Sequence, residues 1–384
     1  MRRVALLIET SRTYGRDLLR GVKRYSQEHG PWSLFVEVRD LETRPPVWLK
    51  NWDGDGILTR SGSAAIATAV GRAGVPAVEL RSTRHGSIFP FVGVDNTVVA
   101  AMVADHFLER GFRHFGVFAL DTEPFFIERR HSFVSYLRAR GHECSVLRQP
   151  GKSEKPEQWE AQQKRLMAWL SDLPRPTAIM ACTDQLGCWL LDACSRSSIR
   201  VPEDIAIVGV ENDETITTMS TPPLSSVRLA GEQIGYEAAR ILDRMMRRLK
   251  PPAQPTLFAP LCIETRQSSD IVAIDDEHLA QAFRLIRQRA CEGLTVDGIL
   301  KVVPISRSSL ERSCRRLLGR SPNQEINRVR IEHVCRFLRD SDLSLEQIAV
   351  RTGFATSQYM LELFRKTTGI TPGNYRRSLM SGER

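Results

Sequence analysis

The sequence predicts an α/β domain of two lobes, followed by an all-α domain with two helix-turn-helix units. Over the first 265 residues, strands alternate with helices in two successive sets, as in parallel, doubly wound sheets. The last 108 residues contain one motif twice, about fifty residues apart, and hold 19 Lys and Arg against 11 Asp and Glu, whereas residues 1–276 are almost neutral. A chain of 384 residues is too long for one ordinary core, so we expect domains at 1–265 and 277–384 and a polar linker at 266–276.

The first domain begins with a buried strand. Residues 4–8 are consecutive apolar residues, followed by a polar turn and a helical pattern. Further strands are expected at residues 33–38, 56–58, 76–80, 91–94, 114–118, 178–182 and 205–210, and helices at 14–29, 97–110, 125–140, 185–195 and 232–249. The alternation restarts after residue 94, which indicates a second lobe and a cleft between the two lobes.

Polar side chains follow several of these strands, and the ends of parallel strands are where such sheets bind ligands. They are Thr10, Ser11, Tyr14, Arg16, Asp17, Asp95, Asn96, Thr183, Asp184, Gln185, Glu211, Asn212 and Asp213. Carboxylates, amides and hydroxyls suit a small polyhydroxylated ligand, since each can hydrogen-bond a vicinal diol. Asp95 and Asp184 can equally well cap the helices beside them, and one residue can do both.

Missing motifs disfavour several other functions. The sequence has no Gly-x-Gly-x-x-Gly, no Gly-x4-Gly-Lys phosphate loop and no recognisable Ser/His/Asp arrangement, so we expect neither an enzyme nor a bound cofactor. Eight scattered cysteines without a Cys-x-x-Cys pair indicate free thiols rather than a metal site. The apolar run at 4–8 is too short for a secretory signal and no run is long enough to span a bilayer, so we expect a cytoplasmic protein with no membrane partner.

The repeated motif lies in the basic domain. Its two copies share the same spacing and read Ser306, Leu310, Cys314, Gly319, Pro322 and Thr356, Met360, Phe364, Gly369, Pro372. Each copy follows a short apolar-periodic segment and a tight turn, which predicts helix-turn-helix units at about 295–318 and 344–367. A pair of such units in a basic domain predicts binding to double-stranded DNA.

Local capping signals delimit the helices of this domain. A helix is expected at 277–289, and Thr295 and Ser306 are candidate N-caps in the first unit. Ser321 and Ser344 each open a capping box with a Gln three residues later. The helix that begins at Ser321 has about 18 residues and is therefore about 27 Å long. Successive major grooves on one face of DNA are roughly 34 Å apart, so this spacer can hold both units on the same side of the duplex.

Two segments of the first domain carry a specific resemblance. They are Ile207-Val208-Gly209-Val210-Glu211-Asn212 and Pro222-Pro223-Leu224-Ser225-Ser226-Val227. The domain resembles the effector domain of the lactose-repressor family, which is similar to periplasmic sugar-binding proteins. The resemblance implies a periplasmic-binding-protein-like fold, in which the second segment returns to the first lobe. It also implies sugar contacts from Asp95, Arg129, Asp184 and Glu211, the last in place of the family's Asp.

Another resemblance covers residues 277–384. It is carried by Gly353-Phe354, Phe364-Arg365-Lys366 and Gly369-Ile370-Thr371-Pro372, which are similar to the arabinose-regulator family of transcription activators. The outward-facing candidates for DNA contact are Arg307, Ser308, Glu311, Arg312 and Arg315 in the first unit and Ser357, Gln358, Leu361, Glu362 and Arg365 in the second.

The resemblance gives these candidates different roles. It implies base contacts from Ser308, Glu311, Arg312, Gln358, Tyr359 and Glu362. Arg312 suits guanine and Gln358 suits adenine, whereas Glu362 either accepts from a cytosine amino group or weakens the second unit. Arg315, Arg316, Arg365, Lys366, Arg376 and Arg377 are expected to contact phosphates.

The order of the two domains is unusual, because lactose-repressor relatives carry their DNA-binding headpiece before the effector domain. From end to end the order resembles that of the bacterial xylose-regulator family. That resemblance implies a homodimer that binds a small sugar effector, reads operator or promoter DNA and, as an activator, works with RNA polymerase. Two alternatives are a sugar-processing enzyme and a solute-binding protein, each with a basic helical tail.

Overall fold

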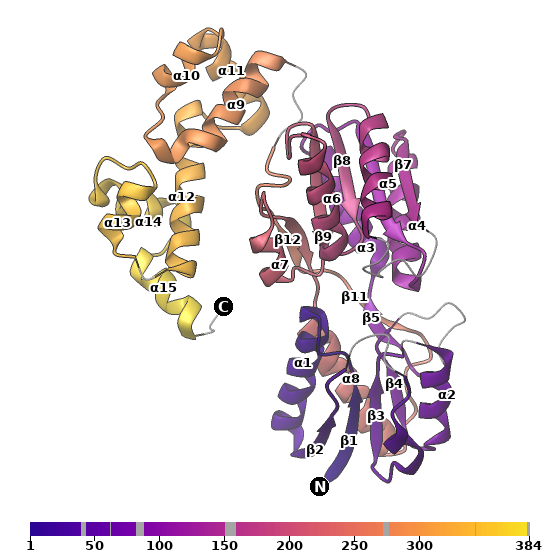
Figure 1. Ribbon diagram of the computed structural model, residues 1–384. Helices are drawn as coiled ribbons and strands as arrows, with labels where there is room; N and C mark the ends of the chain where they lie inside the picture. Colours follow the sequence, from indigo (N-terminus) through magenta and orange to yellow (C-terminus); the bar gives the residue numbers. More distant parts are fainter. Residues whose placement is uncertain are drawn as a thin grey trace. The chain divides into compact units, whose positions relative to one another are not determined.

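The computed structural model describes residues 1–39, 44–61, 63–81, 88–149, 159–271, 276–341 and 343–381. The chain forms two compact units, Met1–Ile271 and Val272–Arg384, and Figure 1 shows that the first is an α/β body of two lobes and the second is all helical. This confirms the predicted fold class. No helix among the described residues is long and apolar enough to cross a membrane.

The first lobe is a four-stranded parallel sheet covered on both faces (Figure 1). Its strands are β1 (Arg2–Leu7), β2 (Trp32–Val36), β3 (Gly56–Thr59) and β4 (Ala77–Glu79), in the order β2-β1-β3-β4. The helices are α1 (Thr13–His29), α2 (Ala64–Arg72), α8 (Gly231–Met246) and the short 3-10 turn η1 (Val47–Asn51). Ala5, Leu7 and Ile57 form one buried cluster with Ile66 and Val70 of α2, because alternate strand residues face opposite sides of a sheet.

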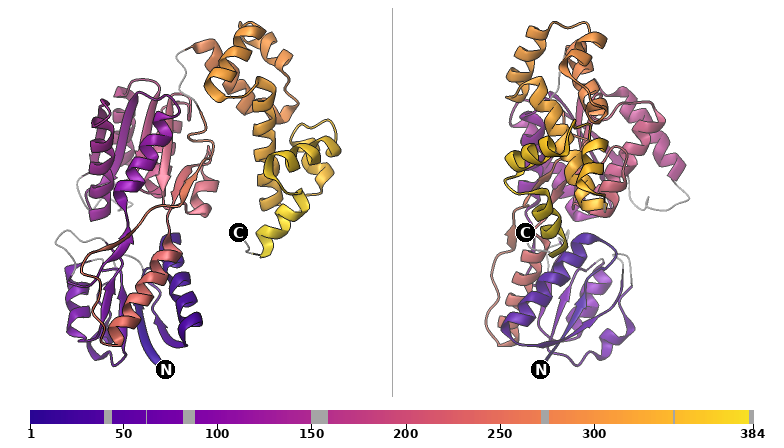
Figure 2. Two further views of the ribbon diagram at one scale, coloured as in Figure 1. Left: turned by 180° about the vertical axis from the view of Figure 1, so that it is seen from behind. Right: turned by 90° about the vertical axis from the view of Figure 1, so that its left-hand side faces the viewer.

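The second lobe is a six-stranded sheet in the order β12-β10-β9-β8-β6-β7. Its strands are β6 (His114–Leu120), β7 (Cys144–Gln149), β8 (Thr177–Ala181), β9 (Ile205–Val210), β10 (Ser225–Arg228) and β12 (Cys262–Glu264). Only the β10–β12 pair is antiparallel among the pairs in this sheet that the structure describes. The helices α3 (Asn96–Leu108), α4 (Pro124–Arg138), α5 (Trp159–Asp172), α6 (Asp184–Arg196) and α7 (Glu214–Met219) surround it, as the two views of Figure 2 show.

Three segments connect the lobes. The short strands β5 (Val92–Val94) and β11 (Thr256–Phe258) pair in parallel, and the third segment joins β10 to α8. Helix α8 then packs on α1 so closely that glycines are required at the contact. A Cβ atom on Gly21 would lie 2.0 Å from the carbonyl oxygen of Glu232, and one on Gly235 would lie 2.0 Å from that of Leu18. This contact returns the chain to the first lobe and positions the start of α1 at the cleft.

Two sequence-based expectations about this unit were wrong in detail. The segment ending at Val227 does not itself return to the first lobe: it forms β10 beside β9, and the crossing follows it. Residues 266–271 are part of the first unit rather than of a linker. The reason is Ser268, which is fully buried, accepts a hydrogen bond from the Ser225 amide (2.8 Å) and donates one to the Ile207 carbonyl (2.6 Å).

The second unit consists of seven α-helices and one 3-10 turn over the described residues. They are α9 (Glu277–Arg289), η3 (Ala290–Glu292), α10 (Val296–Val302), α11 (Arg307–Leu318), α12 (Pro322–Asp340), α13 (Leu345–Arg351), α14 (Ser357–Thr368) and α15 (Pro372–Ser381). The unit has two separate hydrophobic cores. One contains Leu310 and Cys314, and the other contains Met360 and Phe364, so the apolar positions of the repeated motif are its buried positions.

Candidate functional site

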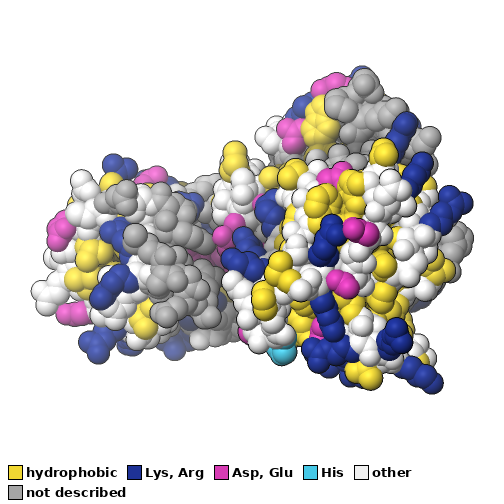
Figure 3. Space-filling model, turned by 90° about the horizontal axis from the view of Figure 1, so that it is seen from below, with side chains coloured by type: hydrophobic (Ala, Val, Ile, Leu, Met, Phe, Trp, Pro, Cys, Tyr) yellow, Lys and Arg dark blue, Asp and Glu magenta, His cyan; other side chains and the backbone are white. Residues whose placement is uncertain are grey.

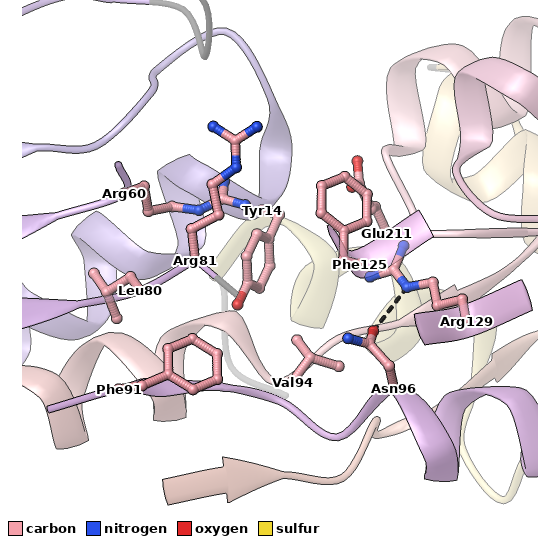
Figure 4. A pocket seen from close by; sticks show the side chains of 10 residues that line it. All are labelled: Tyr14, Arg60, Leu80, Arg81, Phe91, Val94, Asn96, Phe125, Arg129 and Glu211. Atoms are coloured by element: carbon pink, nitrogen blue, oxygen red, sulfur yellow. Dashed lines mark hydrogen bonds between the residues drawn. The ribbon is translucent and has the colours of Figure 1, made fainter. Parts of the chain in front are cut away.

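A cleft between the two lobes collects side chains from the carboxyl ends of the strands. It contains about 380 Å³ of empty space, a volume that includes space open to solvent. The lining residues are Tyr14, Arg60, Leu80, Arg81, Phe91, Val94, Asn96, Phe125, Arg129 and Glu211. Figure 4 shows Tyr14, Arg60 and Arg81 on the side of the first lobe and Asn96, Phe125 and Arg129 on the side of the second.

Arg129 is the most firmly held of the lining side chains. It is 3% exposed, and its Nε donates to Asn96 Oδ1 (2.9 Å) while Nη1 donates to the Cys182 carbonyl (2.6 Å). The guanidinium also lies 5.1 Å from the centre of the Phe125 ring. Burial lowers the pKa of Arg129, and the negative charge of Glu211 opposes that shift. The side chain is therefore fixed in place before any ligand arrives.

Glu211 lies in a strained turn at the end of β9. Its φ is 111° and that of Asn212 is 51°, values that side chains larger than glycine rarely adopt. Such strain is concentrated at functional sites, where the surrounding structure holds it. Here the Glu211 amide donates to the Val227 carbonyl (3.0 Å) and the Asn212 amide donates to Ser226 Oγ (3.0 Å). The turn brings the Glu211 carboxylate to within 3.9 Å of Arg12 Nη1 on the opposite lobe.

The first lobe contributes two arginines that the sequence analysis missed. Arg60 directly follows β3, and Arg81 follows β4 after Leu80. Arg60 forms a buried ion pair with Glu9, and its guanidinium lies 4.9 Å from the centre of the Tyr14 ring. Burial, together with the nearby charge of Arg81, lowers the pKa of Arg60 to about 10. Parallel sheets bind ligands beyond the carboxyl ends of their strands, and this rule also predicts cleft positions for the residues that follow β3 and β4.

Arg81 is only 3% exposed and crosses the cleft to form an ion pair with Glu123, at the start of α4. Tyr14, at the start of α1, is 5% exposed, and burial raises its pKa. Its hydroxyl therefore stays protonated at neutral pH.

Asp184 was expected at the ligand or as a helix cap, and the structure gives it neither position. Its Oδ2 accepts from the Asp213 amide (2.7 Å) and its Oδ1 accepts from the Ser226 hydroxyl. It is 1% exposed and absent from the cleft lining, and burial raises its pKa well above the usual range. The cap of α6 is Thr183, whose side chain accepts from the Leu186 amide. Asp184 thus fastens the end of β9 to β10 from behind the cleft.

Other predicted ligand residues also lie outside the lining. Asp95 caps α3 by accepting from the Thr97 and Val98 amides (3.0 and 3.2 Å), which confirms the capping alternative. Asn212 accepts from Arg266 Nη2 (2.8 Å). Ser11 is exposed, and Asp17 pairs with Arg20 along α1. Arg16 donates to the Thr10 carbonyl (2.9 Å) and lies 3.9 Å from Asp213 on the other lobe.

In the second unit, side chains cap the helices as predicted. Thr295 accepts from the Gly298 amide (3.2 Å) and Ser306 from the Ser309 amide (3.2 Å). Both Ser321–Gln324 and Ser344–Gln347 form complete capping boxes. Gly319 and Gly369 end α11 and α14 with φ values of 67° and 80°, a left-handed conformation that favours glycine.

The outward faces of α11 and α14 carry most of the predicted DNA-contact residues. The exposed ones are Arg307, Ser308, Arg312, Arg315, Arg316, Gln358, Tyr359, Glu362, Arg365 and Lys366. The half-buried ones are Glu311, Ser357 and Leu361. Several side chains are tied to neighbours. Arg307 pairs with Asp297, Gln358 Nε2 donates to Glu362 Oε1 (3.3 Å), and Tyr359 accepts from Asn327 Nδ2 of α12 (3.3 Å). Helix α12, with 19 residues, is about 28 Å long.

Arg376 does not have the position expected of a phosphate contact. Its guanidinium donates to the carbonyls of Leu338 (3.3 Å), Ser341 (3.3 Å) and Leu343 (2.9 Å) at the end of α12. Carbonyls at the end of a helix have no partners within the helix, so Arg376 closes α12 and helps to hold α15.

Three cations of the first unit lie close together, although the net charge of that unit is small. Arg240, Arg244 and Lys250 line a second pocket at the end of α8 and in the segment after it. Figure 3 looks onto this end of the lobe and shows Lys and Arg side chains between apolar ones. The net charge of the whole domain therefore does not reveal this local group of cations.

A two-lobed binding domain with a polar cleft, joined to two helix-turn-helix units, defines a ligand-responsive transcription regulator. Residues 104–269 match the periplasmic binding protein-like domain, residues 299–378 a helix-turn-helix domain and residues 3–97 the XylR N-terminal domain. The chain is 30% identical to the xylose operon regulatory protein of Escherichia coli K12, over 97% of this chain and 96% of that protein. It therefore belongs to the family of xylose operon regulatory proteins.

Two further relatives agree with this assignment. The xylose operon regulatory protein of Haemophilus influenzae is 29% identical over 97% of this chain and 98% of its own length. A solved structure of a xylose-binding transcription activator, XylR, matches with a TM-score of 0.77 at 29% identity, over 98% of both chains. The similarity thus extends over both units in the same order.

Proposed function

We propose that this protein is a cytoplasmic transcription activator that binds a small sugar in the cleft between its lobes and DNA through α11 and α14. The observation that carries the proposal is the cleft itself: a fixed arginine, a carboxylate in a strained turn and aromatic rings line it. Polar groups of this kind bond hydroxyls, and aromatic rings cover the apolar faces of a small ligand. Since relatives are named as xylose regulators, a pentose such as xylose is the first candidate.

The sugar-contacting residues are Arg129, Glu211, Asn96 and Tyr14. Arg129 donates, Glu211 accepts, and the protonated Tyr14 hydroxyl can do both. Arg12 and Arg16 act at the edge of the cleft, where each lies 3.9 Å from a carboxylate of the opposite lobe. Those two pairs tighten when the lobes close around the sugar.

DNA is read by the exposed residues of α11 and α14. Arg312 contacts a guanine and Gln358 an adenine, whereas Arg315, Arg365 and Lys366 neutralise phosphates. Because the two faces differ, one chain reads two unlike half-sites. A homodimer then needs two copies of this asymmetric DNA sequence. The dimer bound at these two copies recruits RNA polymerase.

Control of DNA binding follows from a difference in sugar affinity between two states of the first unit. The sugar stabilises the closed state, closure changes the dimer contact, and the helix-turn-helix units move to a favourable spacing. To reverse a 1:99 population the sugar must prefer the closed state by about 10⁴-fold.

A screen of purified protein against pentoses and hexoses tests this function. Thermal shift measures binding, and chromatography of the same samples measures any turnover. Saturable binding without product supports the regulator. Turnover of a sugar would identify an enzyme, and tight binding without any effect on DNA affinity would identify a solute-binding protein. Arg129→Met should lose sugar binding and keep its affinity for DNA in the absence of sugar.

A further inference from the structure

Helix α12 contributes to both hydrophobic cores of the helical unit. Val329 is buried in the same core as Leu310 of α11, whereas Ile331, two residues later, is buried in the same core as Met360 of α14. Arg330 lies between them in the sequence, where α12 passes from the first helix-turn-helix unit to the second (Figure 1). Because long helices bend, the orientation of α11 relative to α14 also depends on contacts made beside α12.

Arg330 connects the two helix-turn-helix units. Its Nε donates to the Ala290 carbonyl and its Nη2 donates to the Leu294 carbonyl, both at 2.9 Å. These carbonyls lie in the segment that precedes α10, and Ala290 is buried in the core of the first helix-turn-helix unit. The same guanidinium lies 5.6 Å from the centre of the Phe354 ring, which is buried in the core of the second. One half-buried side chain therefore contacts both.

The backbones of the two helix-turn-helix units also meet, at Gly353. This residue lies in the turn between α13 and α14 and has a φ of 71°. A Cβ atom on Gly353 would lie 2.7 Å from the Cys291 carbonyl oxygen and 2.8 Å from the Gly293 nitrogen. Space as well as φ therefore requires glycine at this position, since any side chain would push the turn away from the segment before α10.

These contacts extend to the start of α14 through two aromatic rings. The Phe354 ring packs edge-on against that of Tyr359, with 5.9 Å between their centres. Tyr359 is exposed on α14, and its hydroxyl accepts from Asn327 Nδ2 of α12 (3.3 Å). A change at Arg330 or Gly353 would therefore move the start of α14 relative to α11.

We propose that Arg330 and Gly353 are positioning residues that fix the spacing of the two DNA half-sites read by one chain. They do not contact DNA but hold α11 and α14 in one relative orientation. One base pair added between the half-sites moves one of them by about 3.4 Å along the duplex and about 35° around it. A rigid pair of helices cannot follow that displacement. The inference rests on the proposed function, because it takes α11 and α14 as the helices that read DNA.

Kd values for DNA sites of altered spacing test the inference. The reference is a single copy of the asymmetric site obtained by binding selection, and the altered sites have one or two extra base pairs between its halves. Loss of one base contact weakens binding by about 5- to 150-fold. Fluorescence anisotropy at fixed salt should therefore show that the full chain binds each altered site tenfold or more weakly than the reference site.

Arg330→Met should lower this ratio of Kd values by about threefold or more. Its two helix-turn-helix units can move relative to each other, so they lose preorganisation at the reference site and adapt better to the altered sites. A general loss of stability would weaken binding to every site by the same factor and leave the ratio unchanged. Arg328→Met is the matched control and should keep the ratio, because Arg328 forms ion pairs with Glu325 and Glu332 of its own helix.

Gly353→Ala is an independent variant that should also lower the ratio. Its control is Gly369→Ala, since Gly369 has a similar φ of 80° and no described atom lies within 4 Å of the position of its Cβ. The control introduces the same kind of backbone strain without separating the two helix-turn-helix units, so it should keep the ratio of the unmodified protein. An equal fall of the ratio in both variants would show that strain, and not the contact at Gly353, is responsible.

The results that overturn the inference differ from those that overturn the proposed function. If Arg330→Met keeps the ratio, or if the unmodified protein binds altered and reference sites equally, Arg330 does not fix the spacing and the proposed function stands. If Arg312→Ala and Gln358→Ala both leave the selected consensus unchanged, α11 and α14 do not read bases, and the inference fails with the proposed function.

Discussion

Replacing Asp184 tests whether this carboxylate supports the fold or contacts the effector. In Asp184→Ala, the partly buried Asp213 amide and the buried Ser226 hydroxyl both lose their acceptor. Each unsatisfied buried donor costs about 1–3 kcal/mol. Removal of a buried charge offsets part of this, so the free energy of unfolding of the first unit should fall by about 2–5 kcal/mol. Asp184→Asn should change it by less than about 1 kcal/mol, because its oxygen can accept from Asp213 and its amide can donate to the hydroxyl of Ser226.

Tryptophan fluorescence during urea unfolding measures this effect selectively. All six tryptophans (Trp32, Trp48, Trp52, Trp159, Trp169 and Trp189) lie in the first unit. Asp192→Ala is the matched control: it removes an exposed ion pair with Arg196 on the same helix, which is worth about 0–1 kcal/mol. A normal unfolding midpoint for Asp184→Ala together with lost effector binding would refute the structural role.

The pH dependence of the same measurement adds a second criterion. Burial raises the pKa of Asp184 above its unfolded value. Its contribution to stability is therefore complete below the unfolded pKa and is lost as pH rises through the folded pKa. Asp184→Asn cannot ionise, so its stability should lack this decline toward alkaline pH. Parallel pH profiles for the two proteins would contradict the assignment.

Three other predictions concern particular side chains. Arg312→Ala should weaken binding to the preferred DNA site by about 1–3 kcal/mol and relax base preference at one position, and an unchanged consensus in a binding selection would remove Arg312 from base recognition. Arg376→Ala should destabilise the second unit but leave the salt dependence of DNA binding unchanged, whereas a phosphate contact would lower the slope by about 0.9. Burial lowers the pKa of His106 to about 3, so its stabilisation is present above the unfolded pKa of about 6.5 and is lost as pH falls toward 3. Between pH 7.5 and 5 the first unit should lose about 2 kcal/mol relative to His106→Gln, measured by urea titrations of both proteins.

The sequence predicted the helical unit well because its signals are local. A capping box involves a side chain and a backbone amide three residues away, so Ser321 and Ser344 could be recognised without tertiary structure. The buried residues of the repeat also follow from helical spacing. Arg376 was misjudged because its three carbonyl partners lie 33–38 residues away in the sequence.

The cleft was predicted only in part, because strand ends identify its location but not which side chains face it. Tyr14, Arg129 and Glu211 line it as expected, whereas Arg60 and Arg81 were missed. Asp184 has the residue type and position of a ligand contact. Its oxygens nevertheless bind groups 29 and 42 residues further along the chain, and only the paired strands β9 and β10 bring those groups together.

The central claim is that a sugar in the cleft controls DNA binding by the helix-turn-helix units. The most direct test is the Kd of the full chain for a DNA site obtained by selection, measured by fluorescence anisotropy at fixed salt, with and without the pentoses and hexoses of the sugar screen. We predict a change of tenfold or more with at least one of them, and no change in Arg129→Met. An unchanged Kd with a sugar that calorimetry shows to be bound would contradict the account.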